Sequence, residues 1–134
     1  MGILVEEVRL SAPAITFDSG ALIALERRKE RAMKVYTHAR DRGLIVATPN
    51  VTLVEWWRGR TDRREALLRG LFVEAVSDEI MKLAGIAVGK VGATTIDAIV
   101  AAFAVHHTGI VYTTDVDDFE VLRRFFPALR VFSI

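Results

Sequence analysis

The chain has 134 residues, of which 51% are apolar, and its 18 Lys and Arg against 17 Asp and Glu leave a net charge of +1. This length suits one domain, and the apolar fraction allows a real core and excludes a disordered chain. The absence of cysteine excludes disulfides, zinc–thiolate sites and cysteine nucleophiles, and it fits a cytoplasmic protein.

The first residues of the chain carry no regular pattern. Residues 1–11 lack a clear hydrophobic period, and Glu6 and Glu7 stand where a signal peptide would need a basic region before an apolar stretch. No apolar run in the chain approaches the roughly 20 residues of a membrane span. We therefore expect an N-terminal extension over 1–11, no membrane segment, and a single domain over 1–134.

Beyond this extension, short β-prone runs alternate with segments of helical pattern. Strands are expected at 14–17, 44–47, 72–76, 110–113 and 129–132. Helices are expected at 21–26, at 31–42, from 48–50 to 59, from 61 or 62 to 68, and at 77–88, 96–107 and 115–125. This alternation predicts an α/β fold in which helices flank both faces of a central, mostly parallel sheet of about five strands.

Four acidic residues stand among apolar neighbours or directly after expected strands. Asp18 and Asp115 each follow a strand, and Asp118 lies just beyond Asp115. Glu55 lies inside an apolar helix, and Asp97 lies in the first turn of the most apolar helix. Because ligands of such sheets bind outside the carboxyl ends of the strands, Asp18 and Asp115 are expected at the edge where a ligand would bind.

Each acid taken alone has an ordinary structural explanation. Asp18 could cap a helix, and Asp97 and Asp115 could be helix-start acids, favoured by about 0.3–1 kcal/mol. Glu55 fits this explanation less well, because a position inside a helix offers no capping role and burial without a partner would be costly.

Taken together, the four acids indicate a metal site. Carboxylates within about 4 Å of one another repel by several kcal/mol per pair at an effective dielectric constant near 20, so a fold would not keep such a cluster without a cation. Mg²⁺ and Mn²⁺ prefer carboxylate and water oxygens. The chemistry that needs this arrangement is phosphodiester hydrolysis, in which the metal activates a water and stabilises charge on the phosphate.

Four runs of the sequence, each containing one of these acids, resemble the four motifs of PIN (PilT N-terminal) domains and occur in the family's order. The runs are 15–25, 48–59, 97–104 and 111–119. The metal-binding residues that this resemblance implies are Asp18, Glu55, Asp97 and Asp115. Asp118 would be a fifth acid, and Thr114 would orient the site by hydrogen bonding. The resemblance also implies a PIN-like fold for the domain.

The same resemblance implies an activity and partners. Small single-domain PIN proteins are in most cases the toxin half of VapBC-type toxin–antitoxin pairs. We therefore expect a Mg²⁺- or Mn²⁺-dependent endoribonuclease with an RNA substrate, a cognate antitoxin and a homodimeric assembly. The large aromatics also favour a two-fold dimer, since they are more than a small core readily hides. They are Trp56, Trp57, Phe125 and Phe126.

Several other residues have two readings. His106 and His107 end a helix, where a cation is favoured by the helix dipole; a catalytic role is the alternative. Lys90 lies near two glycines and could reach the site. Of Trp56 and Trp57, one is expected in the core and the other could face a partner. The basic groups in 27–34, 58–69 and 123–130 could contact phosphates or form solvated surfaces.

Two rival functions fit the sequence less well than the nuclease. A phosphotransfer domain also places an Asp after its first strand, but a dehalogenase-like phosphatase needs a second acid where Gly20 stands, and a receiver domain needs a late lysine, whereas none follows Lys90. A PIN-like domain used only for binding would lack one or more acids, and all four are present. An RNA-processing role without toxicity stays open.

Overall fold

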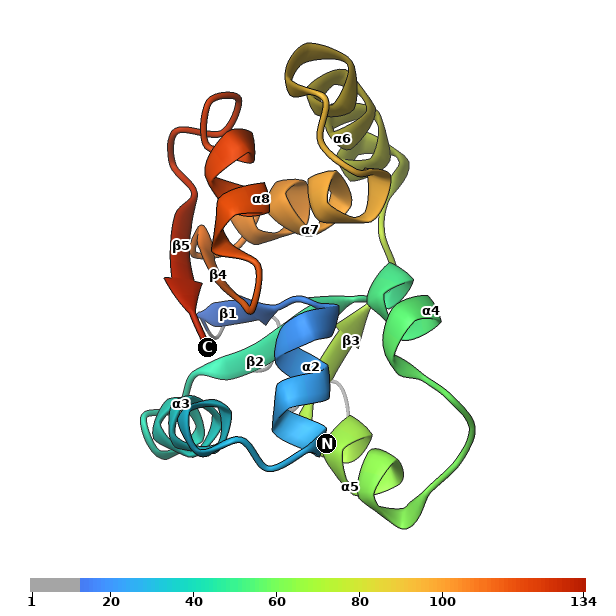
Figure 1. Cartoon of the computed structure of the whole chain (residues 1–134), viewed down its shortest axis with the longest axis vertical. Helices are drawn as coiled ribbons and strands as arrows, with labels where there is room; N and C mark the ends of the chain where they lie inside the picture. Colours follow the sequence, from blue (N-terminus) through green and yellow to red (C-terminus); the bar gives the residue numbers. More distant parts are fainter. Residues whose placement is uncertain (1–12) are drawn as a thin grey trace, which may run out of the picture.

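The five strands form one sheet in which every neighbouring pair runs parallel. The structure is a computed structural model that describes residues 13–134, so the expected extension at 1–11 lies outside the described residues. The strands are β1 (Ala14–Phe17), β2 (Ile45–Pro49), β3 (Phe72–Glu74), β4 (Ile110–Thr113) and β5 (Arg130–Ser133), in the order β3-β2-β1-β4-β5 (Figure 1). The predicted parallel α/β sheet is confirmed.

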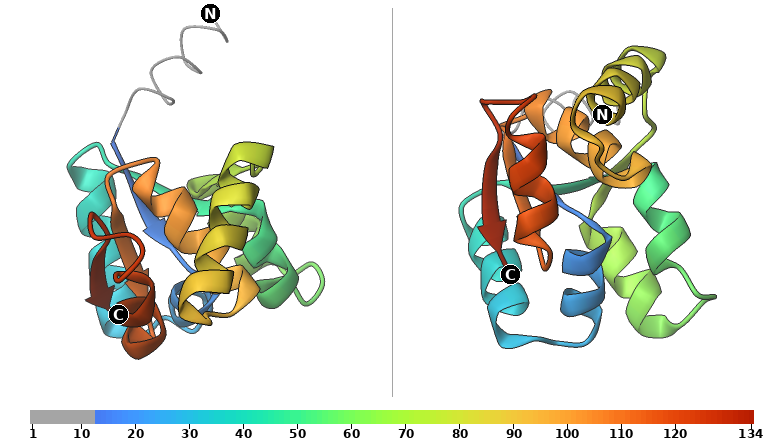
Figure 2. Two further views of the ribbon diagram at one scale, coloured as in Figure 1. Left: turned by 90° about the horizontal axis from the view of Figure 1, so that it is seen from above. Right: turned by 45° about the horizontal axis from the view of Figure 1, so that its top comes forward.

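Helices cover both faces of this sheet. They are α2 (Ser19–Glu26), α3 (Glu30–Asp41), the 3₁₀ turn η1 (Asn50–Thr52), α4 (Leu53–Trp56), α5 (Asp62–Gly70), α6 (Asp78–Val91), α7 (Thr95–Val105) and α8 (Val116–Leu122). Figures 1 and 2 show α6, α7 and α8 on one face and α2, α3 and α5 on the other, with α4 beyond the end of β2. Within residues 13–134, no helix has the length and apolar character needed to cross a bilayer.

Each face of the sheet has its own hydrophobic cluster. On one side α7 lies against the sheet, and every residue from Ala98 to Ala104 is buried, as expected for the most apolar helix. Small alanines let α7 approach β1 closely, and α6 and α8 pack beside it. On the other side the largest buried side chains are Phe17 and Trp56. Because β1 is central and buried on both faces, the residue that follows it is placed firmly.

Several helix boundaries differ from the sequence prediction: α7 ends at Val105 rather than at 107, and α8 ends at Leu122 rather than at 125. Two further differences have a clear local cause. The helix expected from 48–50 to 59 is one turn of 3₁₀ helix followed by α4, which ends at Trp56. Pro49 is instead the last residue of β2, with ψ of 146°. The helix expected at 77–88 continues through Gly89 to Val91, because the residue that ends it is Gly92, whose φ of 73° is the left-handed conformation.

Candidate functional site

All five acids singled out in the sequence line one pocket at the carboxyl edge of the sheet. This pocket has a volume of about 380 Å³. Its lining residues are Asp18, Ser19, Gly20, Glu55, Thr94, Thr95, Ile96, Asp97, Thr114, Asp115 and Asp118. They come from the ends of β1 and β4 and from α2, α4, α7 and α8. We call this the acid pocket.

Asp18 is the most deeply placed of these acids. Its Oδ1 accepts a hydrogen bond from the backbone N–H of Ala21 at 2.8 Å, so Asp18 caps α2 as well as lining the pocket. Its Oδ2 accepts from the hydroxyl of Thr113 at 2.5 Å. Burial raises the pKa of Asp18 to about 6, helped by the charges of Asp97 and Glu55, although both hydrogen bonds oppose this shift.

Thr113 ties the ends of β1 and β4 together. Its hydroxyl donates to Asp18 and accepts from the backbone N–H of Asp115 at 2.9 Å. Thr113 was not predicted from the sequence, and Thr114 was predicted in its place. Thr114 is exposed and lies beside Gly20 so closely that a Cβ on Gly20 would collide with its Oγ1. The two-residue period of β4 carries the missing signal, since Val111 and Thr113 share the buried face of the strand.

Glu55 reaches the pocket from α4 and is exposed. The cost of burying this carboxylate therefore does not arise, because α4 is only one turn long and Trp56, next along the chain, takes the buried position. The expected place of Glu55 in the middle of a longer helix was wrong, since it lies in the first turn of α4. The hydroxyl of Ser19 donates a hydrogen bond to Glu55 Oε1 at 2.8 Å. Ser19 thus links the start of α2 to α4, a contact between residues 36 positions apart that local patterns do not reveal.

A buried pair of threonines fixes where α4 begins. The Thr48 hydroxyl donates to the Phe17 carbonyl at 2.8 Å, and it lies 2.7 Å from the Thr52 hydroxyl. Thr52 in turn donates to the Pro49 carbonyl at 2.9 Å. These bonds attach the turn before α4 to the end of β1, directly before Asp18.

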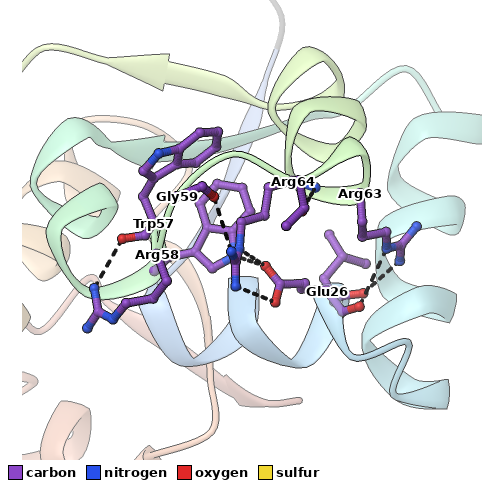
Figure 3. A network of polar contacts seen from close by, with 9 residues as sticks. Glu26, Trp57, Arg58, Gly59, Arg63 and Arg64 are labelled. Atoms are coloured by element: carbon purple, nitrogen blue, oxygen red, sulfur yellow. Dashed lines mark hydrogen bonds and ion pairs between the residues drawn. The ribbon is translucent and has the colours of Figure 1, made fainter.

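The other end of α4 is held by a polar network around Glu26 (Figure 3). The Trp56 indole N–H donates to Glu26 Oε1 at 3.0 Å, and Arg64 reaches the same carboxylate with Nε at 2.7 Å and Nη2 at 3.3 Å. Arg63 binds the backbone carbonyls of Leu25 and Glu26. Both charged side chains of the Glu26–Arg64 pair are largely buried, at 22% and 17% exposed. We call these contacts the Glu26 network.

The acids at the start of α7 and α8 repel one another. Burial raises the pKa of Asp97, and the charges of Asp118 and Glu55 add to this, whereas a hydrogen bond from the Thr94 side chain lowers it. The pKa of Asp115 is raised first by its hydrogen bond with Asp118, then by desolvation and by the neighbouring charges. The pocket therefore concentrates negative charge that nothing else in it neutralises, as none of its lining residues is a lysine or arginine.

The carboxylates of the acid pocket line its walls but do not surround one common point. Among the described residues, no three His, Cys, Asp or Glu side chains are close enough together to hold a metal ion directly. The donor set nevertheless suits Mg²⁺ or Mn²⁺, because carboxylate and hydroxyl oxygens are the ligands these ions prefer. Mg²⁺ also keeps several of its waters, so carboxylates around an open pocket can hold it partly through water.

The remaining candidates lie away from the acid pocket. His107 Nε2 is 2.9 Å from Glu74 Oε2, and His106 Nδ1 is 3.1 Å from the Ala102 carbonyl, both at the far end of α7 from Asp97. These contacts favour the structural reading of the two histidines. Lys90, near the end of α6, is not among the residues that line the pocket.

The comparisons with known proteins bear on the fold. No family model matches the chain, and no curated protein matches it either. Among solved structures, the chain is similar to a chain of the crystal structure of VapBC2 from Rickettsia felis bound to a DNA fragment from their promoter. The TM-score is 0.72 at 12% identity, over 90% of this chain and 98% of that one. At this identity the likeness shows the fold, and the PIN-like fold expected from the motifs is confirmed.

Proposed function

We propose that this protein is a metal-dependent endoribonuclease that hydrolyses RNA phosphodiester bonds, and that it is the toxin of a type II toxin–antitoxin pair. The observation that best supports nuclease activity is the acid pocket, which is lined by acids from four separate segments of the chain at the carboxyl edge of a parallel sheet. Ligand sites of such sheets lie at this edge.

The electrostatics of the pocket support a cation. Asp18 is 6% exposed and has a pKa of about 6, so near neutral pH the protein keeps a buried negative charge beside further acids. An arrangement that destabilises its own charges is typical of a functional site rather than of a structural one. A divalent ion would relieve the repulsion, and when bound it would supply an activated water and charge stabilisation for phosphodiester hydrolysis.

The proposal gives each residue of the site a role. Asp18, Glu55, Asp97 and Asp115 would hold Mg²⁺ or Mn²⁺, and Asp118 would be a fifth acid for a second ion or a water. Thr113 orients Asp18 and the backbone of Asp115, and Ser19 orients Glu55. Thr114, which lies beside Gly20, would support the site by hydrogen bonding.

Metal dependence is the direct test of the nuclease. The purified chain should cleave single-stranded RNA, cleavage should stop with a chelator, and it should return with Mg²⁺ or Mn²⁺. Undiminished cleavage in excess chelator would contradict a mechanism that depends on these carboxylates.

The toxin role rests on the motif resemblance and the shared fold. The similar structure is that of VapBC2, bound to DNA from their promoter. By analogy, this chain would act in the cytoplasm and be silenced by an antitoxin encoded beside it. A guanidinium is a bidentate match for carboxylate, so an antitoxin arginine inserted into the acid pocket would compete with the metal. Trp56 is 2% exposed and already bonded to Glu26, so of the two tryptophans only Trp57 can contribute to such a contact.

Co-expression tests the toxin role separately from the nuclease. The product of the neighbouring reading frame should co-purify with this chain and block RNA cleavage. If it fails to bind, or binds without lowering cleavage, the toxin role is wrong and the chain is an RNA-processing nuclease instead.

A further inference from the structure

A second pocket adjoins the acid pocket and has the opposite charge. It has a volume of about 390 Å³ and is lined by Arg27, Lys29 and Arg31 together with small and apolar residues, and none of its lining side chains is an aspartate or glutamate. Gly20 and Thr114 line both pockets. The two hollows therefore meet at these two residues, and we call the second one the basic groove.

The geometry of α2 explains why the groove leads away from the acids. Gly20, Ile23, Ala24 and Arg27 all line it, at the spacing of one face of a helix. At 1.5 Å per residue, Gly20 and Arg27 are about 10 Å apart along the axis. The groove thus begins at the acid pocket and ends at cations roughly that far from it.

The cations of the groove are free to bind a ligand. Among the hydrogen bonds and ion pairs of residues 13–134, none involves the side chains of Arg27, Lys29 or Arg31, and all three residues are exposed. Five arginines elsewhere are instead held by backbone carbonyls or by a glutamate. Those held in this way are Arg58, Arg63, Arg64, Arg123 and Arg130. Of the three basic groups in the sequence, the first is the one whose residues line the pocket that shares Gly20 and Thr114 with the acid pocket.

We propose that the basic groove binds the sugar–phosphate backbone of single-stranded RNA that flanks the bond to be cut. This inference rests on the proposed nuclease activity. A phosphate at the carboxylates would be about 10 Å from the cations, so the groove contacts neighbouring phosphates rather than the reacting one. Its apolar lining is Ile23, Ala24 and Ile134, without an aromatic ring for base stacking. The groove therefore adds affinity and direction without selecting a base sequence.

Salt dependence of RNA binding tests this role without requiring cleavage. A labelled, mixed-sequence single-stranded oligoribonucleotide is titrated with the full chain in chelator, at salt concentrations from about 50 to 200 mM. A plot of log K against log salt falls with a slope of about −0.7 for each phosphate contact, so each lost contact makes the slope less steep by about 0.7. The variant Arg27→Ala/Arg31→Ala should therefore make the slope less steep by about 1.4 and weaken RNA binding on the order of tenfold at low salt.

The matched control is Lys82→Ala/Arg124→Ala, which removes the same charge from exposed positions on α6 and just beyond α8. It should leave the slope unchanged. If both double variants lose RNA affinity and salt dependence equally, or if the wild-type chain does not bind RNA, the proposed role of the basic groove is wrong. So would a groove variant that keeps its RNA affinity but loses the co-expressed neighbour protein, since the groove would then bind a protein. Metal-dependent RNA cleavage by the wild-type chain is measured in parallel. If it is present, the proposed nuclease activity stands even where the proposed role of the groove is wrong.

Discussion

The carboxyl group of Asp18 combines two demands that conflict. As the cap of α2 it must accept a hydrogen bond from the Ala21 N–H, which favours the charged form. As a buried side chain near Asp97 and Glu55, it is pushed toward the neutral form, and its pKa rises to about 6. Without a cation, the folded chain therefore holds this charge at a cost in stability.

The first prediction follows from that pKa. Because the pKa of Asp18 is about 6 in the folded chain against 3.8 as the ordinary value, the folded state binds this proton more tightly than the unfolded state. The contribution of Asp18 to stability is thus greatest in acid and is lost as pH rises from about 4 to about 6, in total about 3 kcal/mol. Urea unfolding of metal-free wild-type and Asp18→Asn chains should show the difference growing across this range, in favour of Asn at higher pH. A difference independent of pH would contradict the raised pKa.

The second prediction separates a metal ligand from a helix-start acid. Asp97→Asn should abolish RNA cleavage while leaving the metal-free chain as stable as the wild type or slightly more stable, because repulsion within the acid pocket falls. Asp78→Asn is the matched control, since Asp78 lies in the first turn of α6, outside the pocket. It should cost up to about 1 kcal/mol and spare cleavage. A thermal melt and an RNA assay measure both effects. If Asp97→Asn also loses a little stability and still cleaves RNA, Asp97 is only a helix-start acid and not a metal ligand.

The acids of the pocket were predictable from the sequence, and their hydroxyl partners were not. An acid after a buried strand or inside an apolar helix stands out against its neighbours, as Asp18 and Glu55 do. Ser19 and Thr113 do not, because serine and threonine are common at helix starts and in strands. Their roles arise from contacts between segments 36 and 95 residues apart.

At the scale of elements, α4 is the part of the site with the least stability of its own. It is a single turn of four residues, and an isolated turn of helix is unstable because nucleation fixes several residues for one hydrogen bond. Its position therefore depends on Thr48 and Thr52 before it and on the Glu26 network after it. Trp56 belongs to that network, so the network also determines where its neighbour Glu55 lies.

The third prediction concerns this network. Glu26→Gln leaves the largely buried Arg64 without its ion pair, and breaking one side of a buried pair costs about 3–5 kcal/mol. The partial exposure of the pair puts our expectation near the lower end, at about 3 kcal/mol. Glu30→Gln is the matched control, because the Glu30–Lys34 pair is 83% and 75% exposed and worth about 0–1 kcal/mol.

Chemical unfolding of the two variants measures this difference. If α4 loosens as we expect, Glu26→Gln should also weaken Mn²⁺ binding in the chain that remains folded, whereas Glu30→Gln should not. Equal stabilities of the two variants would show that the Glu26 network does not hold α4.

The order and type of the elements were readable from the sequence, because alternating apolar runs of strand and helix length leave few alternatives. The helix after β2 was not, since its sequence looks helical as far as Gly59. Hydrogen bonds from Thr48 and Thr52 fix where it begins, and the burial of Trp56 fixes where it stops. Tertiary contacts of this kind override local propensity.

At the scale of the whole molecule, two of the four large aromatics that were expected to need a partner are covered by the chain itself. Trp56 and Phe126 are buried within the chain, at 2% and 5% exposed, so they do not require a partner to cover them. Other apolar side chains remain uncovered. The large hydrophobic residues exposed in the described part of the chain are Val54, Met81, Ile86 and Phe132.

The fourth prediction is that the chain nevertheless forms a two-fold homodimer, the commonest symmetric assembly, which would cover part of this exposed apolar surface. Light scattering at micromolar concentration should give twice the mass of 14.9 kDa. A mass equal to that of one chain would contradict the dimer without affecting the acid pocket, which one chain completes with its own residues.

The central claim is that the acid pocket binds a divalent cation, and calorimetric titration of Mn²⁺ into the purified chain tests it most directly. Above pH 6, where Asp18 is ionised, the wild-type chain and Asp78→Asn should bind Mn²⁺ alike. Asp97→Asn should bind at least about tenfold more weakly, and wild-type affinity should fall as pH drops below 6. Absence of binding by the wild-type chain, or equal binding by Asp97→Asn, would contradict the account.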